Sequence, residues 1–105
     1  MIDDPAIDVL RQRIDAIDHE LMALLAKRLD VVHLVGEVKR AKSLPVFDPG
    51  REERLLLRLI QDAPARLDER AVREIFHAIV SQCRRMEGEQ IEEAGRSPTG
   101  DRLAQ

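Results

Sequence analysis

Two basic residues in the first part of the sequence share a predicted helix face with apolar residues. Between residues 7 and 38, apolar side chains recur at alternating three- and four-residue steps, and Arg28 lies on this stripe, seven residues after Leu21 and seven before Val35. Lys39 follows eleven residues after Arg28, which is close to a whole number of helical turns. A cation removed from water is costly unless an anion meets it. For Arg28 we therefore favour an anionic ligand or a buried ion pair over an arginine that extends its charge into water.

The spacing of these cations along the helix limits which of them can share a ligand. Arg28 and Lys39 lie about 16 Å apart along a helix axis, and side chains that reach about 6 Å can meet a small molecule between them. Arg11 lies about 25 Å from Arg28 and about 100° around the helix, so it cannot reach the same small ligand. In an antiparallel dimer, however, the Arg11 of a second copy comes near Arg28. The sequence therefore predicts two equivalent pockets for a dianion, each assembled from both chains.

A second charged cluster lies in the stretch VFDPGREERL. Asp48 followed by Pro49 is typical of a helix start, so we expect a helix from Asp48, as the N-cap, to about Asp62. Asp48, Arg51 and Glu52 then crowd the first turn of a helix whose next residues are leucines. These groups are either ordinary surface charges or polar side chains that hold a small ligand at the helix start.

An acid marks the apolar face of a third predicted helix, which begins after the candidate cap Asp68. Glu87 lies four residues after Cys83 and eleven after Phe76, so the three share one face. Glu87 is either a buried acid with a functional role or the residue at which burial of this face ends, just before Gly88. Cys83 by itself is more typical of a small core residue than of a reactive thiol.

The longest predicted helix runs from Pro5 to about Lys42, with Asp3 or Asp4 as its cap. Such a helix is about 57 Å long, whereas a compact monomer of this size has a radius of gyration of about 13 Å. A second copy packed antiparallel about a twofold axis would cover its apolar stripe. We therefore predict an all-α fold of three helices, one very long and two shorter, in an intertwined antiparallel homodimer. The alternative is two shorter helices broken near Gly36.

Composition supports a single helical domain. We expect this domain over residues 1–94, followed over residues 95–105 by a polar tail that contains Gly and Pro and lacks order. Aromatic residues make up 2% of the chain and charged residues 35%, which favours amphipathic helices over a sheet. The net charge of −3 argues against a broad nucleic-acid interface.

Other sequence features bound the environment of the chain. We expect no signal peptide and no membrane span, because the N-terminus is acidic and no apolar run is long enough. A lone cysteine excludes an internal disulfide framework and fits a reducing compartment, so we expect a cytoplasmic protein. The three histidines lack metal-ligand spacing, so no metal is expected. Several other basic residues are interpreted as solvated charges: Lys27, Arg40, Lys42, Arg54, Arg58, Arg84 and Arg85.

Four segments, taken together and in order, resemble the all-helical chorismate mutases, including the mutase domains fused to prephenate dehydratase. They are LRQRIDAIDHELMALLAKR at 10–28, VGEVKRAK at 35–42, PVFDPGREERLL at 45–56 and IFHAIVSQCRRME at 75–87. The resemblance implies an intertwined three-helix homodimer that converts chorismate, a dicarboxylate, to prephenate by an intramolecular Claisen rearrangement. Such a reaction requires no nucleophile, cofactor or metal. Catalysis would come from holding the reactive conformer and from stabilising charge on the breaking C–O bond.

The resemblance also implies roles for the cationic residues. Arg28 and the partner's Arg11 would clamp the two carboxylates, and Lys39 would donate to the ether oxygen. Where many relatives have a hydroxyl residue that helps to hold a carboxylate, this chain has Cys83, a weak donor. Where many have a glutamine that donates to the ether oxygen, this chain has Glu87. Because only a protonated carboxyl can donate, we expect Glu87 to act as a neutral acid, with activity that falls as the pH rises.

The acids of the second helix complete the implied site. Glu52, with Asp48, would accept a hydrogen bond from the ring hydroxyl of the substrate. Arg51 would complete the charged lining of the site and offset the charge of these two acids. Alternatives remain open: an isochorismate pyruvate-lyase, an aminodeoxychorismate mutase, or a non-catalytic helical dimer. An acid at Glu52 together with Lys39 favours the hydroxyl-bearing substrate of a chorismate mutase.

Overall fold

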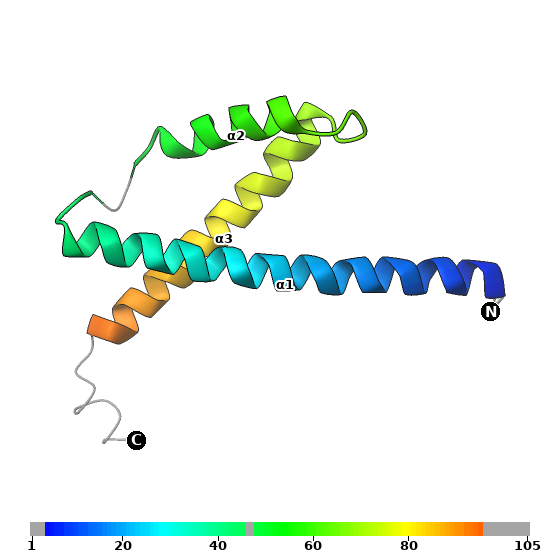
Figure 1. The fold of residues 1–105 in the computed structure, drawn as a ribbon, viewed down its shortest axis with the longest axis horizontal. Helices are drawn as coiled ribbons and strands as arrows, with labels where there is room; N and C mark the ends of the chain where they lie inside the picture. Colours follow the sequence, from blue (N-terminus) through cyan, green and yellow to red (C-terminus); the bar gives the residue numbers. More distant parts are fainter. Residues whose placement is uncertain (1–3, 46–47, 96–105) are drawn as a thin grey trace, which may run out of the picture. The chain divides into compact units, whose positions relative to one another are not determined.

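The chain folds into three α-helices. The computed structural model describes residues 4–45 and 48–95, with side chains for 4–45 and 48–88. The helices are α1 (Pro5–Ala41), α2 (Arg51–Asp62) and α3 (Glu69–Gly95), and the described ranges contain no strand (Figure 1). The predicted all-α class, with one very long helix and two shorter ones, is therefore confirmed. The chain forms two compact units, residues 1–31 and 32–105.

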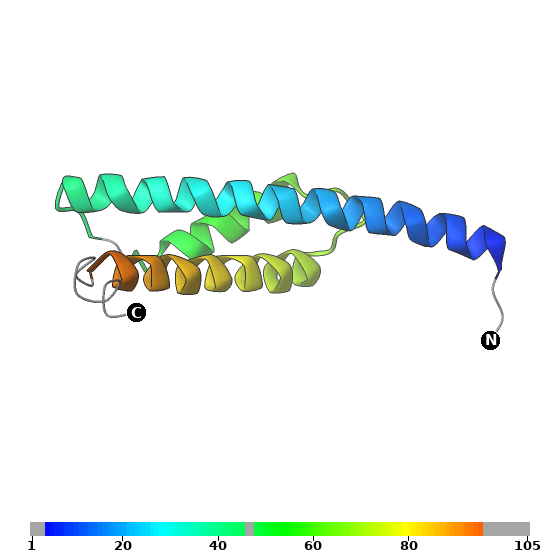
Figure 2. The same cartoon turned by 90° about the horizontal axis from the view of Figure 1, so that it is seen from below.

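Helix α1 is continuous over 37 residues, so the alternative of a break near Gly36 is wrong (Figures 1 and 2). Asp4 caps its start, because its Oδ1 accepts a hydrogen bond of 2.9 Å from the Ala6 N–H. The other candidate cap, Asp3, lies outside the described residues. At the other end the Leu44 N–H donates to the Lys39 carbonyl at 2.7 Å.

This exit from α1 is a Schellman motif. Ser43 adopts a left-handed conformation, with φ of 54°, and its N–H donates to the Arg40 carbonyl at 3.2 Å. The next N–H, that of Leu44, reaches back to Lys39 in the pattern that defines the motif. Pro45 follows at once and cannot extend a helix. The sequence-based end of this helix is confirmed within one residue.

In the unit formed by residues 1–31, the apolar stripe of α1 is exposed in the single chain. Each of its long aliphatic side chains leaves about half of its surface open to solvent. The exposed fractions are 45% for Ile7, 52% for Leu10, 55% for Ile14, 55% for Ile17, 51% for Leu21 and 59% for Leu24. A regular apolar face of this length on one helix is typical of a surface that a protein partner covers.

In the unit formed by residues 32–105, α2 packs against α3. Leu56 on α2 and Val72 and Cys83 on α3 are buried, with exposed fractions of 5% or less. Asp68 caps α3 as predicted, because its Oδ1 accepts a hydrogen bond of 2.8 Å from the Ala71 N–H. Helix α3 continues past Gly88 to Gly95, and the tail predicted to lack order, apart from its first residue, lies outside the described residues.

The predicted N-cap of α2, Asp48, is wrong by two residues. Asp48 does not cap the helix; its Oδ1 accepts a hydrogen bond of 3.1 Å from the Gly50 N–H, two residues on. The Arg51 N–H donates to the Asp48 carbonyl, so Asp48 closes a turn that precedes the helix. Gly50 becomes the N-cap, without a side-chain hydrogen bond. Asp48 therefore stands outside α2, whereas Glu52 lies within its first turn.

Among the described residues, no helix is long and apolar enough to cross a membrane.

Candidate functional site

Asp48 is held by basic neighbours at the start of α2. Its Oδ2 accepts a hydrogen bond of 2.7 Å from Arg54 Nη2, and its Oδ1 accepts one from the Gly50 N–H. Partial desolvation raises the pKa of Asp48, but the Arg54 hydrogen bond and charge, the Gly50 N–H and the charge of Lys39 together lower it below 3.8. Asp48 is therefore a carboxylate at neutral pH, with Lys39 close enough to contribute to its charged state.

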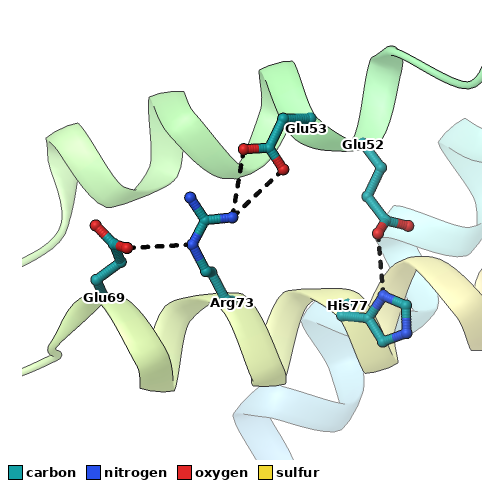
Figure 3. Close-up of polar contacts among 5 residues, drawn as sticks. All are labelled: Glu52, Glu53, Glu69, Arg73 and His77. Carbon is teal, nitrogen blue, oxygen red and sulfur yellow. Dashed lines mark hydrogen bonds and ion pairs between the residues drawn. The ribbon is translucent and has the colours of Figure 1, made fainter.

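Glu52 is held from α3. Its Oε2 lies 3.0 Å from His77 Nδ1 (Figure 3). Its Oε1 lies 3.9 Å from Arg84 Nη2. The Glu52 side chain is 24% exposed, which leaves it open to an additional partner. Two basic side chains on one face of α3 therefore fix the acid that the first turn of α2 presents.

Next to this pair, a second set of polar contacts joins α2 to α3. Arg73 Nη1 lies 3.3 Å from both carboxylate oxygens of Glu53, and Arg73 Nε donates to Glu69 Oε2 at 3.3 Å (Figure 3). The hydrogen bond to Glu69 is the largest effect on the pKa of Arg73 and raises it. Desolvation lowers this pKa, but the charge and hydrogen bond of Glu53 add to the effect of Glu69, so the pKa is raised overall. Together with the His77–Glu52 contact, this arginine defines how α2 lies along α3.

Arg51 is not the residue that contacts the two candidate acids in the single chain. Its side chain is exposed, while the two acids that it was expected to offset contact other residues. Asp48 pairs with Arg54, and Glu52 with His77 and Arg84. Arg54 and Arg84 were interpreted as solvated charges, so sequence reasoning missed both as neighbours of candidate site acids.

Glu87 is a buried acid, so the interpretation in which burial ends at this residue is wrong. Its exposed fraction is 7%. Its Oε2 lies 3.1 Å from His33 Nδ1, and its Oε1 lies 3.6 Å from Arg40 Nη1. Oε1 is fully buried and has no hydrogen-bond partner among the described residues. A carboxyl oxygen buried in this way is uncommon and indicates either a functional role or a missing partner.

The close approach of Glu87 explains a glycine inside α1. A Cβ atom added at Gly36 would lie 2.8 Å from Glu87 Oε1 and 3.1 Å from Arg40 Nη1. Gly36 is itself buried, and a helix-interior glycine is unfavourable by about 1 kcal/mol relative to alanine. The glycine therefore makes room for the carboxyl of α3 against the backbone of α1.

The predicted site residues divide between the two units. One group lies within residues 32–105: Lys39, Asp48, Arg51, Glu52, Cys83 and Glu87. Among these, Cys83 is buried, Lys39 and Glu52 are half-buried, and Arg51 is exposed. Arg11 and Arg28 belong to the unit of residues 1–31, where Arg11 is exposed and Arg28 is half-buried. No group of three or more metal-ligating side chains occurs among the residues whose side chains are described.

Comparison with known proteins connects this arrangement to one family. The family model of chorismate mutase type II matches residues 10–88. The T-protein of Enterobacter agglomerans is 44% identical over 59 residues, which are 56% of this chain but only 16% of that protein. The 4-amino-4-deoxychorismate mutase of Streptomyces pristinaespiralis is 31% identical over 93 residues, which are 88% of this chain and 71% of that protein.

Solved structures agree in fold. The chorismate mutase of Helicobacter pylori in complex with prephenate superposes with a TM-score of 0.77 and 29% identity, covering 86% of this chain and 98% of that one. The Thermus thermophilus chorismate mutase (form II) has a TM-score of 0.75 and 29% identity, covering 81% and 97%. The family match spans every candidate site residue, from Arg11 to Glu87. The chain belongs to the chorismate mutase type II family.

Proposed function

We propose that this chain converts chorismate to prephenate by an intramolecular Claisen rearrangement. The observation that carries the proposal is the family match over residues 10–88, which contains all of the cationic and acidic residues expected to hold the substrate. A neighbour in fold, the Helicobacter pylori enzyme, was solved with prephenate. This chain spans less than a fifth of the length of T-protein.

In the proposed mechanism, two arginines bind the substrate through its carboxylates. Arg28 holds one carboxylate and the partner's Arg11 the other, because guanidinium groups match carboxylates in charge and geometry. Lys39 donates to the ether oxygen as negative charge develops on it. Cys83 is buried and adds at most a weak donor.

The acids of the site bind the ring. Glu52 and Asp48 accept a hydrogen bond from the ring hydroxyl of the substrate, and Arg51 contributes positive charge at the solvent-exposed side of the site. His77 and Arg84 keep Glu52 in place from α3. This division of roles restricts the flexible enolpyruvyl side chain to its reactive conformer, which supplies much of the rate acceleration expected of such an enzyme.

Glu87 is proposed to act as a neutral acid that donates to the ether oxygen. The Glu87 side chain is buried, with an exposed fraction of 7%, and Arg40 Nη1 lies 3.6 Å from its Oε1. Activity should therefore fall as the pH rises, and Glu87→Gln, whose amide donates at every pH, should flatten the profile. If Glu87→Gln stays active with the same pH dependence as the natural chain, Glu87 has no such role.

A homodimer is part of the proposal. The apolar stripe of α1 is about half exposed along residues 7–24, and a second copy of the same stripe, packed antiparallel, is complementary to it. Only such a dimer gives each pocket an Arg11. Sedimentation of the purified chain at low micromolar concentration tests this part: the proposal expects a single dimeric species, and a monomer that is fully active would contradict it.

A second candidate substrate is the amino analogue of chorismate. The Streptomyces pristinaespiralis relative, a 4-amino-4-deoxychorismate mutase, matches 88% of this chain and supports this alternative. The two substrates differ in the ring substituent that would face Glu52. A carboxylate accepts from either a hydroxyl or an ammonium group, so Glu52 is compatible with both. Incubation with chorismate, 4-amino-4-deoxychorismate and isochorismate separates the candidates: prephenate formation supports the first proposal, the amino product the second, and release of pyruvate a lyase.

The proposed reaction assigns the chain to the biosynthesis of aromatic amino acids, downstream of the shikimate pathway. A cytoplasmic location is proposed with it, because the lone Cys83 fits a reducing compartment. Fractionation of cells that express the natural gene tests this location.

A further inference from the structure

His33 forms a link between two carboxyl groups in the unit of residues 32–105. Its Nδ1 lies 3.1 Å from Glu87 Oε2, and its Nε2 lies 3.0 Å from Glu37 Oε1. Glu37 stands one turn beyond His33 on α1, whereas Glu87 comes from α3. The His33 side chain is 37% exposed and that of Glu87 is 9% exposed, so the link runs from solvent to a buried acid.

The two oxygens of Glu87 have different surroundings. Oε2 is engaged by the His33 ring, while Oε1 is buried without a hydrogen-bond partner among the described residues. Oε1 lies against the backbone of Gly36, where a Cβ atom would come within 2.8 Å of it. The backbone of α1 therefore makes room for the carboxyl at Gly36, and Arg40 Nη1 lies 3.6 Å from the same oxygen.

The positions of the hydrogens follow from the chemistry of the ring. An imidazole nitrogen donates only when it carries a proton, and both nitrogens carry one in the imidazolium form. When Nδ1 carries a proton, the ring donates and Glu87 Oε2, 3.1 Å away, accepts. Glu37 supports this state, because its carboxylate accepts the second N–H of the His33 ring.

We propose that His33 is a positioning residue for Glu87: by donating Nδ1–H to Oε2, it fixes the orientation of the carboxyl that α3 presents. The proposal rests on the proposed mutase function, in which Glu87 donates to the ether oxygen. His33 itself does not touch the substrate. It acts through Glu87.

The neighbours of the Glu87 carboxyl come from α1 and from its own helix, α3. His33 and Arg40 face it from α1, and Arg40 Nη1 lies 3.6 Å from Oε1. Lys39 adjoins Arg40 along α1, and Cys83 lies one turn before Glu87 on α3. Two basic side chains of α1 therefore contact the carboxyl directly. Removing the N–H of His33 should reduce the rate.

Two substitutions test the role of this N–H. His33→Asn keeps a side-chain N–H near the position of Nδ1 but carries no charge, whereas His33→Leu removes both. We expect His33→Leu to lower kcat about tenfold with KM changed less than about twofold, because the lost contact acts on the chemical step. We expect His33→Asn to retain kcat within about threefold, because its amide keeps a donor for Glu87 Oε2.

His19 provides the matched control. It is exposed, and its Nδ1 bonds to the carbonyl of Asp15 one turn earlier on the same helix. His19→Asn and His19→Leu should leave kcat, KM and the pH profile unchanged. Equal effects of the His33 and His19 substitutions would overturn the positioning role, as would a His33→Leu variant with the kcat and pH profile of the natural chain.

An NMR measurement tests the same contact without reference to activity. We expect a downfield, slowly exchanging Nδ1–H signal from His33 that moves in Glu87→Gln and disappears in His33→Leu. A His33 signal that is unchanged in Glu87→Gln would contradict the contact even in an active enzyme. If the natural chain is inactive on chorismate while this signal behaves as expected, the proposed function fails but the pairing of His33 with Glu87 stands. If His33→Leu does not fold, His33→Asn and the Glu87→Gln spectrum decide the question.

Discussion

The Nδ1 atom of His77 on α3 lies 3.0 Å from Oε2 of Glu52 on α2, so the third helix holds the acid that begins the second. Arg84, two turns further along α3, approaches the other oxygen of the same carboxyl at 3.9 Å. The acid is thus oriented by tertiary contacts and not by its own helix. Its position depends on the way in which α2 lies along α3.

Loss of His77 should therefore weaken catalysis without removing the fold. In His77→Leu, Glu52 keeps only the longer contact with Arg84, and we expect kcat/KM to fall about fivefold, the effect of one hydrogen bond of about 1 kcal/mol. Steady-state kinetics on chorismate measures the change. The control is Arg70→Gln, which breaks an exposed ion pair with Glu74 on the same helix. Equal activity of the two variants would show that His77 does not orient Glu52.

Replacing Gly36 should separate stability from activity. In Gly36→Ala the added methyl group meets Glu87 Oε1 at 2.8 Å, and the end of this flexible side chain must move. We expect an unchanged or slightly higher melting temperature, because alanine favours the helix by about 1 kcal/mol, together with a kcat reduced about tenfold or more. Thermal unfolding and kinetics on the same sample measure both.

Gly88 supplies the control for that substitution. It also lies inside a helix, but a Cβ atom there would have no neighbour within 4 Å. Gly88→Ala should raise the melting temperature and leave kcat unchanged. If Gly36→Ala behaves like Gly88→Ala, the close approach between Gly36 and Glu87 has no catalytic consequence.

Asp48, in the turn before α2, should make the stability of the fold depend on pH in the acidic range. The pKa of Asp48 in the folded chain is lower than 3.8, despite a desolvation effect that raises it, because Arg54, Gly50 and Lys39 favour the carboxylate. A lowered pKa stabilises the fold above the unfolded value and loses this contribution as the pH falls through the folded value. The difference in urea midpoint between the natural chain and Asp48→Asn should therefore be largest above about pH 4 and shrink toward pH 2. A difference that grows on acidification would contradict this assignment.

Much of the fold follows from local sequence patterns. The apolar spacing from Ile7 to Val38 predicts a helix whose observed end differs by one residue, since Pro45 and the Ser43 turn stop it. Asp4 and Asp68 are caps that sequence rules identify directly. In each case the decisive interactions lie within a few residues along the chain, which is the range over which sequence patterns carry information.

The arrangement of the site follows less from the sequence, because it depends on contacts between helices. Asp48 has the sequence signature of an N-cap, yet its side chain bonds to Gly50 and Arg54 and the helix starts later. The pairing of Glu52 with His77 joins residues 25 positions apart, and that of His33 with Glu87 joins residues 54 positions apart. No local pattern identifies such partners. The burial of Glu87, in contrast, is one of two alternatives that the sequence leaves open, because Glu87 shares a helix face with Cys83.

The central proposal, that two chains build each pocket, is tested most directly by mixing two inactive variants. Arg11→Ala and Arg28→Ala chains are each expected to lose activity as homodimers, because both pockets lack one arginine. After subunit exchange, a mixed dimer has one pocket with both substitutions and one with neither. Random exchange of equal amounts should therefore restore about one quarter of the activity of the natural chain. A mixture no more active than the average of the two separate variants, with exchange demonstrated by mass spectrometry, would contradict the shared pocket.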